Sequence, residues 1–475
     1  MLFYEPLFLF VFFPTFYALY LLTERRIRGR LAIILAGSML FYAWIEPLFV
    51  PIVIVSALVD YLIGRRIAAL PEGSGQARLL VTVGVVANLG ILAHFKYTRF
   101  LLENVYLLMH GAHAPAMSLP EIALPVGVSF IVFEKITYVV DIYRRVSRPA
   151  PGFATYLLYV FLFPKLLAGP IIKYHELDAQ LAAIPAARWN DISAGFVRFM
   201  MGVVKKLLIA DILATGADRV FGADPSAVGF SDAWLGVLLF TFQIYFDFSA
   251  YSDMAIGIAR MLGFRLRENF DMPYIACSIT EFWRRWHISL TTWIREYLYI
   301  PLGGNRVPAL RHYFNLWVCF FASGLWHGAA WPYVVWGAYN GLFLVLDKLF
   351  LLRVLDRMPR VAANLVTFLV VMVGWTIFRA HTMDQAGALF AAMLTPGRPE
   401  RALGVFITPD ILTAAAVAAL ICAVPRLPFY ERARRAAFAT SGREIAIQTG
   451  IALLFVIAVG KAVADPFQPF LYFRF

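Results

Sequence analysis

Charged residues are scarce in this chain. Of its 475 residues, 15% are Asp, Glu, Lys or Arg and 61% are apolar, whereas soluble domains carry about 25% charged residues. This composition excludes a soluble multidomain protein. Apolar runs of about 20 residues, long enough to cross a bilayer as a helix, recur along the chain. The sequence therefore predicts a polytopic helical membrane protein, with one continuous membrane domain over residues 1–475.

Strand patterns, cysteine clusters and several catalytic motifs are also missing. No run alternates like a membrane-spanning strand, which makes the expected fold class all-α. The three cysteines, Cys277, Cys319 and Cys422, are far apart and encode neither a disulfide framework nor a metal site. GxSxG, Walker and HExxH patterns are absent, which argues against serine hydrolysis, nucleotide hydrolysis and zinc proteolysis. The net charge of +12 reflects membrane topology, so we expect no nucleic-acid partner.

Predicted spans cover both ends of the chain. They lie at residues 6–23, 31–45, 47–63, 79–95, 120–141, 362–378, 402–424 and 445–463. The loops after the first, third and fifth spans are basic, through Arg25, Arg26, Arg28 and Arg30, then Arg65, Arg66 and Arg78, then Arg144, Arg145 and Arg148. Because basic loops mark the cytoplasmic side, we expect the N-terminus and the 103–118 loop to face outward.

The middle third of the chain breaks this regular pattern. Its apolar stretches are short and interrupted, as in Phe163–Pro170 (FPKLLAGP). Irregular backbone at membrane depth is tolerated only where protein or a water-filled cavity surrounds it. We therefore expect re-entrant or interfacial helices that line a cavity, and we look for a functional site here.

The first candidate site is the segment from Ser278 to His287 (SITEFWRRWH). Ser278 and Glu281 have the spacing of a capping box, which predicts a helix start. On that helix Trp283 and His287 would share one face, with Arg284, Ile288 and Arg295 on another. An amphipathic interfacial anchor that grips lipid headgroups is the alternative to a catalytic role.

The second candidate is His327. No Asp, Glu, Lys or Arg lies between Arg311 and Asp347, so His327 stands in a charge-free apolar stretch. An ionisable group at membrane depth is a functional hypothesis by default, and histidine can accept and return a proton near neutral pH. Gly324 and Gly328 would allow a substrate or helix to approach closely. The alternative is a neutral histidine that is hydrogen-bonded between helices.

A third cluster lies at residues 245–253 (YFDFSAYSD). Asp247 and Asp253 follow an apolar run and need partners if they are buried. Arginines near in sequence could supply them: Arg260, Arg265, Arg267, Arg284 and Arg285. We expect a structural ion-pair network here, with catalysis as the alternative.

Several motifs spread over nearly the whole chain. The main ones are FWRRWH at 282–287, YIPLGGNR at 299–306 and GLWHG at 324–328. Supporting stretches are LPVGVSF at 124–130, FPKLLAGP at 163–170, residues 245–257 and FLYFRF at 470–475. Together they resemble the membrane-bound O-acyltransferases, in particular the bacterial alginate O-acetyltransferase branch. Two places depart from the family pattern, since Lys165 stands where Gln is common and Glu134 with Lys135 is unusually charged.

The resemblance implies an architecture and catalytic residues. It implies a ring of transmembrane helices around a thinned centre, with a tunnel from a cytoplasmic donor site to an outward-facing funnel. His327 matches the family's invariant histidine, and His287 matches its Asn-or-His position. Candidates for lining the tunnel are Trp283, Trp286, Trp326, Ser323, Asp253 and Tyr245.

The expected reaction is direct acyl transfer. His327 would accept the proton of an acceptor hydroxyl as it attacks an acetyl thioester, and His287 would orient or polarise the thioester carbonyl or hold the leaving group. The donor would be acetyl-CoA or another acyl thioester on the cytoplasmic side, with no tightly bound cofactor.

The expected setting is the bacterial cytoplasmic (inner) membrane, among its lipids. An outward-facing partner protein would accept the acetyl group and pass it to an alginate-like exopolysaccharide. Peptidoglycan O-acetylation and teichoic-acid D-alanyl transfer are the alternatives within the enzyme class. A transporter or flippase with a histidine proton relay, and a purely structural membrane subunit, are the alternatives outside it.

Overall fold

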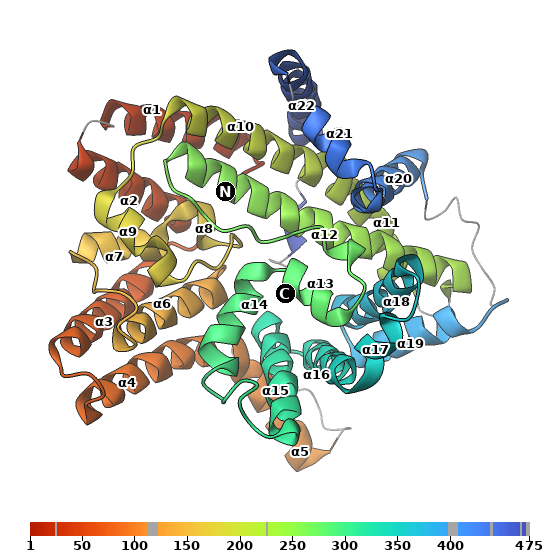
Figure 1. Ribbon diagram of the computed structural model, residues 1–475, viewed down its shortest axis with the longest axis horizontal. Helices are drawn as coiled ribbons and strands as arrows, with labels where there is room; N and C mark the ends of the chain where they lie inside the picture. Colours follow the sequence, from red (N-terminus) through yellow and green to blue (C-terminus); the bar gives the residue numbers. More distant parts are fainter. Residues whose placement is uncertain are drawn as a thin grey trace. The chain divides into compact units, whose positions relative to one another are not determined.

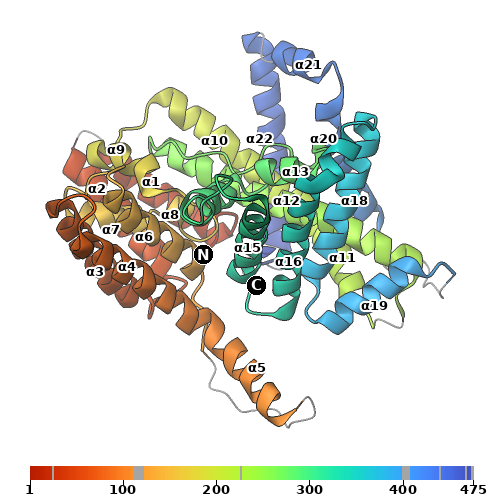
Figure 2. The ribbon, with the colours of Figure 1, turned by 60° about the horizontal axis from the view of Figure 1, so that its bottom comes forward.

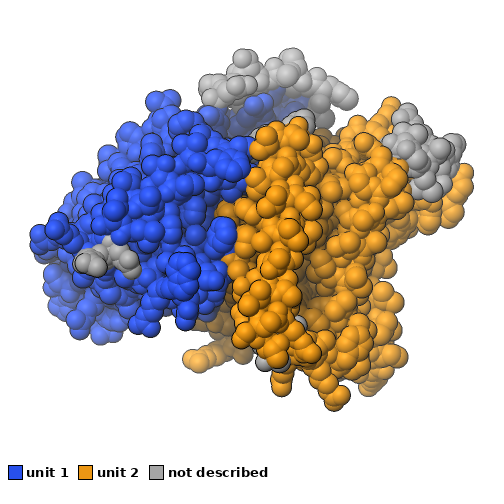
Figure 3. All heavy atoms as spheres, turned by 90° about the horizontal axis from the view of Figure 1, so that it is seen from above, with its two compact units in different colours: residues 1–196, 255–267 blue, residues 197–254, 268–475 orange. Residues whose placement is uncertain are grey.

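The computed structural model describes residues 1–23, 26–111, 122–224, 227–397, 407–437, 440–465 and 468–471. Regular structure within these ranges is helical and includes no strand (Figure 1), which confirms the all-α fold class. The chain forms two compact units, coloured separately in Figure 3. Unit 1 comprises Met1–Phe196 and Ala255–Arg267, and unit 2 comprises Val197–Met254 and Glu268–Phe475.

Unit 1 contains the early apolar helices. They are α1 (Phe13–Thr23, after a π-helical turn Phe8–Phe12), α2 (Ile27–Ala43), α3 (Val50–Ala69), α4 (Gly75–Leu92), α5 (Thr98–His110), α6 (Val128–Tyr143), α7 (Phe153–Phe161), α8 (Phe163–Leu166), α9 (Tyr174–Ala183) and the first part of α10 (Trp189–Val204). Ser74 caps α4, because its hydroxyl accepts a hydrogen bond from the Ala77 amide at 3.2 Å. A π-helical segment, Ala93–Tyr97, joins α4 to α5.

Helices α4 and α5 are continuous, which corrects part of the predicted 103–118 loop. Gly75–His110 is a continuous helix of 36 residues, and Figure 2 shows α5 continuing from α4. Residues 103–110 of the predicted 103–118 loop are therefore helical. Residues 112–118 lie outside the described residues.

The irregular stretch at residues 162–173 is buried inside unit 1. It contains the single turn α8, then a turn at residues 167–169 and irregular backbone up to residue 173. The Tyr159 hydroxyl donates to the Ile172 carbonyl at 2.8 Å, and the Ile172 amide donates to the Glu134 carboxylate at 3.4 Å. Protein side chains thus satisfy both backbone groups of Ile172, as burial in an apolar setting requires.

The charged residues that depart from the family pattern pair with partners inside unit 1. Lys165 forms an ion pair with Glu134, and its ammonium nitrogen lies 4.6 Å from the centroid of the Tyr159 ring. Lys135 forms an ion pair with Asp60 at 3.2 Å. All four charged side chains are almost completely buried. Each departure is therefore compensated by an opposite charge.

Unit 2 contains the remaining helices. They are the end of α10, a π-helical segment Lys205–Ala210, α11 (Asp211–Phe221), α12 (Phe230–Met261, whose last turns belong to unit 1), α13 (Ile279–Arg285), α14 (Ile288–Ile294), α15 (Ala309–His327), α16 (Trp331–Leu346), α17 (Leu352–Leu355), α18 (Arg360–Arg379), α19 (Met383–Leu394), α20 (Pro409–Ala423), α21 (Tyr430–Ala437) and α22 (Ser441–Ala464). Short 3-10 turns lie at Pro273–Ile275 and Val424–Arg426. Two further π-helical segments, Arg295–Tyr299 and Asp347–Leu351, follow α14 and α16.

Five helical runs of the described residues are long and apolar enough to cross a membrane. They are Gly75–His110, Phe230–Met261, Arg360–Arg379, Pro409–Arg426 and Ser441–Ala464. Four of them overlap predicted spans, although the first residues of the 402–424 span lie outside the described residues. Phe230–Met261 was not predicted as a span, because its carboxylates suggested irregular structure. The ring and tunnel implied by the resemblance stay a prediction.

Candidate active site

The helix predicted from Ser278 begins as expected. α13 starts at Ile279, and the Ser278 hydroxyl accepts a hydrogen bond from the Glu281 amide at 3.1 Å. The Glu281 carboxylate accepts from the Cys277 amide at 2.8 Å, one residue before the position that a capping box requires. The helix start predicted at Ser278 is therefore confirmed.

The end of this helix was predicted wrongly. α13 ends at Arg285, Trp286 is extended, and His287 has a left-handed backbone with φ of 44°. Trp283 and His287 consequently lie on different elements and share no helix face. No Gly, Asn or Pro marks the break, so its cause is tertiary: the Ile288 amide donates to the Asn269 carbonyl at 2.9 Å.

His287 is buried between unit 2 elements, with 1% of its surface exposed. Its Nδ1 lies 3.2 Å from the side-chain oxygen of Asn269. Its ring stands edge to face against Phe248 of α12, with a centroid distance of 4.7 Å. The Ser289 hydroxyl lies 3.4 Å from the same nitrogen, so the imidazole has polar partners at Nδ1 within otherwise apolar surroundings.

His327 is the last residue of α15 and is also buried, with 6% exposed. Its Nδ1 lies 2.7 Å from the carbonyl oxygen of Ser323, so Nδ1 carries the proton and Nε2 is the acceptor. The rings of Trp336 and Phe378 lie 5.0 and 5.5 Å from its ring. The imidazole is thus fixed in direction and shielded from water.

Small residues bring α15 and α16 together at His327, as the sequence predicted. A side-chain carbon at Gly324 would lie 2.3 Å from the Tyr333 carbonyl, and one at Gly328 would lie 2.1 Å from the Tyr333 ring. Only glycine fits these two positions without displacing α16.

The structure brings the two histidines into one cluster through Trp326. The Trp326 ring lies 6.0 Å from the His287 ring and 4.9 Å from the His327 ring. Burial, and then the charge of His327, lower the pKa of His287 well below that of an ordinary histidine. His287 is therefore neutral at neutral pH.

Aromatic candidates extend this cluster. Trp286 packs against Trp375 at 4.9 Å and against Tyr245 of α12 at 6.1 Å. Trp283 packs against Trp336 at 5.6 Å, and its indole nitrogen donates to the Asn340 side-chain oxygen at 3.3 Å. Of the residues proposed to line a tunnel, Trp283, Trp286, Trp326, Ser323 and Tyr245 therefore belong to one packed region.

Asp253 lies in a separate ion-pair network, which confirms its expected structural setting. It contacts Arg198 at 2.9 Å and Lys205 at 2.6 Å. Asp247 contacts Lys206 at 2.8 Å. The arginines proposed from sequence were the wrong partners: Arg260 and Arg265 pair with Asp191, Arg267 pairs with Glu176, and Arg285 pairs with Asp271 and Glu281.

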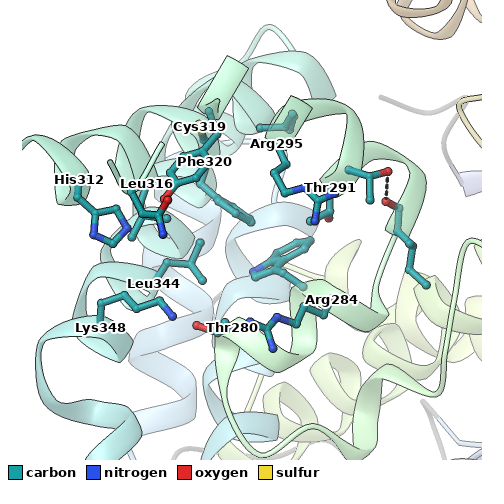
Figure 4. Close-up of a pocket in the computed structure, with 16 residues that line it drawn as sticks. Thr280, Arg284, Thr291, Arg295, His312, Leu316, Cys319, Phe320, Leu344 and Lys348 are labelled. Atoms are coloured by element: carbon teal, nitrogen blue, oxygen red, sulfur yellow. Dashed lines mark hydrogen bonds between the residues drawn. The ribbon is translucent and has the colours of Figure 1, made fainter. Parts of the chain in front are cut away.

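A cavity of about 630 Å³ opens beside the aromatic cluster that contains Trp283 (Figure 4). Apolar side chains such as Leu316, Phe320 and Leu344 form much of its wall. Its basic lining consists of Arg284, Arg295, His312 and Lys348. In Figure 4, His312 and Lys348 lie on one side of the cavity and the two arginines on the other. The arrangement suits a ligand with an anionic part and an apolar part.

Two tryptophan rings connect the cavity to His327. Trp283 lines it, and Trp336 lies between the rings of Trp283 and His327. Arg295 and Lys348 stand on π-helical segments, which occur frequently at functional sites. Arg284, Ile288 and Arg295, predicted to share a helix face, all line the cavity although the helix is broken.

Sequence reasoning missed His312, Lys348 and Asn269. The first two are ordinary basic residues near the ends of an apolar stretch, and only the packing of α15 on α16 brings them to one cavity. Asn269 stands in an irregular segment without a motif that was recognised. Its distance in sequence from His287 gave no signal of their contact.

Comparison with known proteins establishes the family. The model of the membrane-bound O-acyltransferase family matches residues 121–383, a segment that includes both histidines and every residue of the cavity. The chain is a membrane-bound O-acyltransferase. The resemblance seen in the sequence is thereby confirmed, and this polytopic membrane-bound O-acyltransferase is an acyl-transferring enzyme.

Similar proteins include relatives of three different names. The "Probable alginate O-acetylase AlgI" of Azotobacter vinelandii is 37% identical over 511 aligned positions that cover all of both chains. The "Peptidoglycan O-acetyltransferase" of Helicobacter pylori is 35% identical, over 83% of this chain and 80% of its own. A "Teichoic acid D-alanyltransferase" of Streptococcus thermophilus is 25% identical, over 47% of this chain and 57% of its own.

Proposed function

We propose that this enzyme transfers an acetyl group from a cytoplasmic thioester to a hydroxyl acceptor, for the O-acetylation of an exported, alginate-like polysaccharide. The observation that carries this proposal is the likeness to alginate O-acetylases, which extends over the whole chain. The paired buried histidines beside a basic cavity support the reaction type. Relatives that act on other polymers match less of the chain.

In the proposed reaction the acceptor oxygen attacks the thioester carbonyl. A carbon–oxygen bond forms and the carbon–sulfur bond breaks, while Nε2 of His327 accepts the hydroxyl proton and returns it to the departing sulfur. The Ser323 carbonyl supports this role, because it keeps the proton at Nδ1 and leaves Nε2 as the base. No serine or cysteine nucleophile takes part.

His287 takes a complementary role in this proposal. Since Asn269 receives the Nδ1 proton, Nε2 of neutral His287 is an acceptor and has no hydrogen to polarise a carbonyl. Of the expected roles, holding the leaving group fits this tautomer best. His287 then accepts a hydrogen bond from the thiol once His327 has protonated the sulfur.

The cavity is the proposed donor site. Phosphates of acetyl-CoA, or of a carrier-protein phosphopantetheine, would lie near Arg284, Arg295 and Lys348, with the thioester arm along the apolar wall toward Trp283. A cavity of about 630 Å³ falls within the range of small-molecule sites.

Neutralising these cations should weaken donor binding. Arg284→Gln, Arg295→Gln and Lys348→Gln are each expected to raise the KM for acetyl-CoA about 5- to 10-fold, with kcat nearly unchanged, because each removes a charge-assisted contact to phosphate. Thiol release by the purified protein measures this. Arg357→Gln is the matched control, since Arg357 is exposed and outside the cavity. An unchanged KM in all three variants would remove the donor from this cavity.

The proposed setting is the inner membrane of a bacterium with the N-terminus outside. The basic loops support this orientation, which places Arg65 and Arg144 in the cytoplasm. We also propose an outward-facing partner protein that receives the acetyl group, because a buried site cannot grip a long hydrated polysaccharide.

Cysteine accessibility in intact cells tests the orientation. With the three native cysteines changed to Ser, a cysteine replacing exposed Leu108 should react with an impermeant reagent, and one replacing exposed Arg28 should react only after the membrane is opened. Labelling at position 28 in intact cells would contradict the assignment.

A deletion strain tests the acceptor. Acetyl esters should disappear from the exported polysaccharide and persist on peptidoglycan. Loss confined to peptidoglycan would favour the alternative suggested by the Helicobacter pylori relative, and loss of D-alanine from teichoic acid would favour the alternative suggested by the Streptococcus thermophilus relative.

A further inference from the structure

Asn269 is completely enclosed in unit 2, with 1% of its surface exposed, and its side-chain amide has a defined orientation. Its oxygen accepts hydrogen bonds from the Ser289 amide at 3.2 Å and the Ser289 hydroxyl at 2.9 Å. Its nitrogen donates to the Ser252 hydroxyl at 3.2 Å. Because a backbone N–H can only donate, the atom it meets must be the Asn269 oxygen.

This orientation determines the tautomer of His287. The same Asn269 oxygen lies 3.2 Å from His287 Nδ1, and an oxygen that accepts from Ser289 can only accept here too. Nδ1 must therefore carry the proton, and Nε2 must have the lone pair. The backbone of Asn269 adds a second restraint, since its carbonyl accepts from the Ile288 amide at 2.9 Å.

The backbone restraint holds an unfavourable conformation. His287 has φ of 44° and ψ of 53°, a left-handed conformation that side chains other than glycine seldom adopt. Such a residue costs about 1 kcal/mol or more and persists where its surroundings hold it. Asn269 provides two such restraints. Its side-chain oxygen contacts the His287 ring, and its backbone carbonyl accepts a hydrogen bond from the Ile288 amide.

We propose that Asn269 is the positioning residue of the acyl-transfer site: it fixes the neutral Nδ1–H tautomer and the ring direction of His287, so that Nε2 faces the reacting groups as a hydrogen-bond acceptor. This inference rests on the proposed function, because it assigns His287 to that reaction. Asn269 itself touches neither substrate nor the transferred group in this account.

The charges around His287 make the proposal testable by pH. His327, on α15, is the titratable group whose charge acts on it. The other side chains in contact with it are neutral: Phe248 of α12, Asn269 of the segment that follows α12, Ser289 of α14 and Trp326 of α15. A carboxylate at position 269 would place a negative charge at Nδ1 and stabilise the protonated imidazole.

Asn269→Asp and Asn269→Leu separate positioning from folding. Thiol release from acetyl-CoA is measured against pH on the purified full-length protein in detergent, with a hydroxyl compound supplied as acceptor. In Asn269→Asp the acidic limb of the profile should move upward by about 1 to 2 pH units, with activity recovering toward wild type at alkaline pH. In Asn269→Leu kcat should fall about 10- to 100-fold at every pH, with the KM for acetyl-CoA unchanged.

Ser252→Ala is the matched control, because it removes the hydrogen bond at the amide nitrogen and leaves the contact with His287. Its pH profile should follow wild type. ¹⁵N spectra of labelled histidines, with the His287 signals assigned by comparison with His287→Asn, provide a readout that is independent of activity. They should show the Nδ1–H tautomer in wild type and its loss in Asn269→Leu.

A wild-type pH profile in Asn269→Asp, or an Nε2–H tautomer of His287 in the wild-type spectra, would overturn the inference. Failure of the wild-type protein to release thiol from any acetyl thioester when a hydroxyl acceptor is supplied would instead contradict the proposed function. The tautomer spectra distinguish the two failures.

Discussion

His327→Gln is expected to lower the turnover of acetyl-CoA by about 10²- to 10⁴-fold, the usual contribution of a general base. Glutamine can still donate a hydrogen bond to the Ser323 carbonyl but cannot take up a proton. The buried volume is nearly preserved, so the temperature of thermal unfolding should stay close to that of wild type. Thiol release and thermal unfolding of the purified protein measure the two effects.

His110→Gln is a matched control for this change. His110 also ends a helix, and its Nδ1 lies 3.1 Å from the carbonyl of the residue four positions earlier, Tyr106. It is exposed, in contrast to buried His327. This variant should turn over acetyl-CoA at the wild-type rate. Turnover by His327→Gln within a few fold of wild type would remove His327 from the mechanism.

Lys165→Met should lower the stability of the protein strongly. It leaves the Glu134 carboxylate buried without its ion-pair partner, and breaking a buried pair from one side costs about 3–5 kcal/mol. The irregular segment at 162–173 should loosen as well, because Glu134 also accepts from the Ile172 amide. Thermal unfolding of the purified protein measures the loss.

The double variant Glu134→Gln with Lys165→Met is the control. Removing both charges leaves no unpaired charge, so it should recover most of the stability that Lys165→Met loses. A double variant no more stable than the single one would mean that the two side chains do not compensate each other.

Much of the helical framework could be predicted, because apolar runs and caps are local signals. The spans at 362–378 and 445–463 correspond to α18 and α22, and Ser278 marks the start of α13. Continuity is harder to predict. The predicted fourth span ended at residue 95, whereas α4 continues through a π-helical segment into α5.

The two histidines differ in what the sequence could reveal. His327 was identified because it is ionisable in a stretch without charge, and its burial agrees with that reading. The surroundings of His287 could not be predicted, since the break after Arg285 depends on contacts with Asn269. Backbone conformation at such a site is decided by tertiary hydrogen bonds and not by local propensity.

The ion-pair partners of Asp247 and Asp253 could not be predicted from neighbouring residues in the sequence either. That Asp253 and Asp247 need cations follows from the cost of burying a carboxylate. Which cations supply the charge depends on the approach of α10 and the segment that follows it, which bring Arg198, Lys205 and Lys206 to α12. The nearest arginines in sequence turned out to pair elsewhere.

The acetyl-ester content of the exported polysaccharide in a complemented deletion strain tests the central claim most directly. Wild-type protein should restore the esters, and His327→Gln, present in the membrane at the same amount, should restore almost none. Full restoration by His327→Gln, or a deletion strain that keeps all of its polysaccharide esters, would contradict the account.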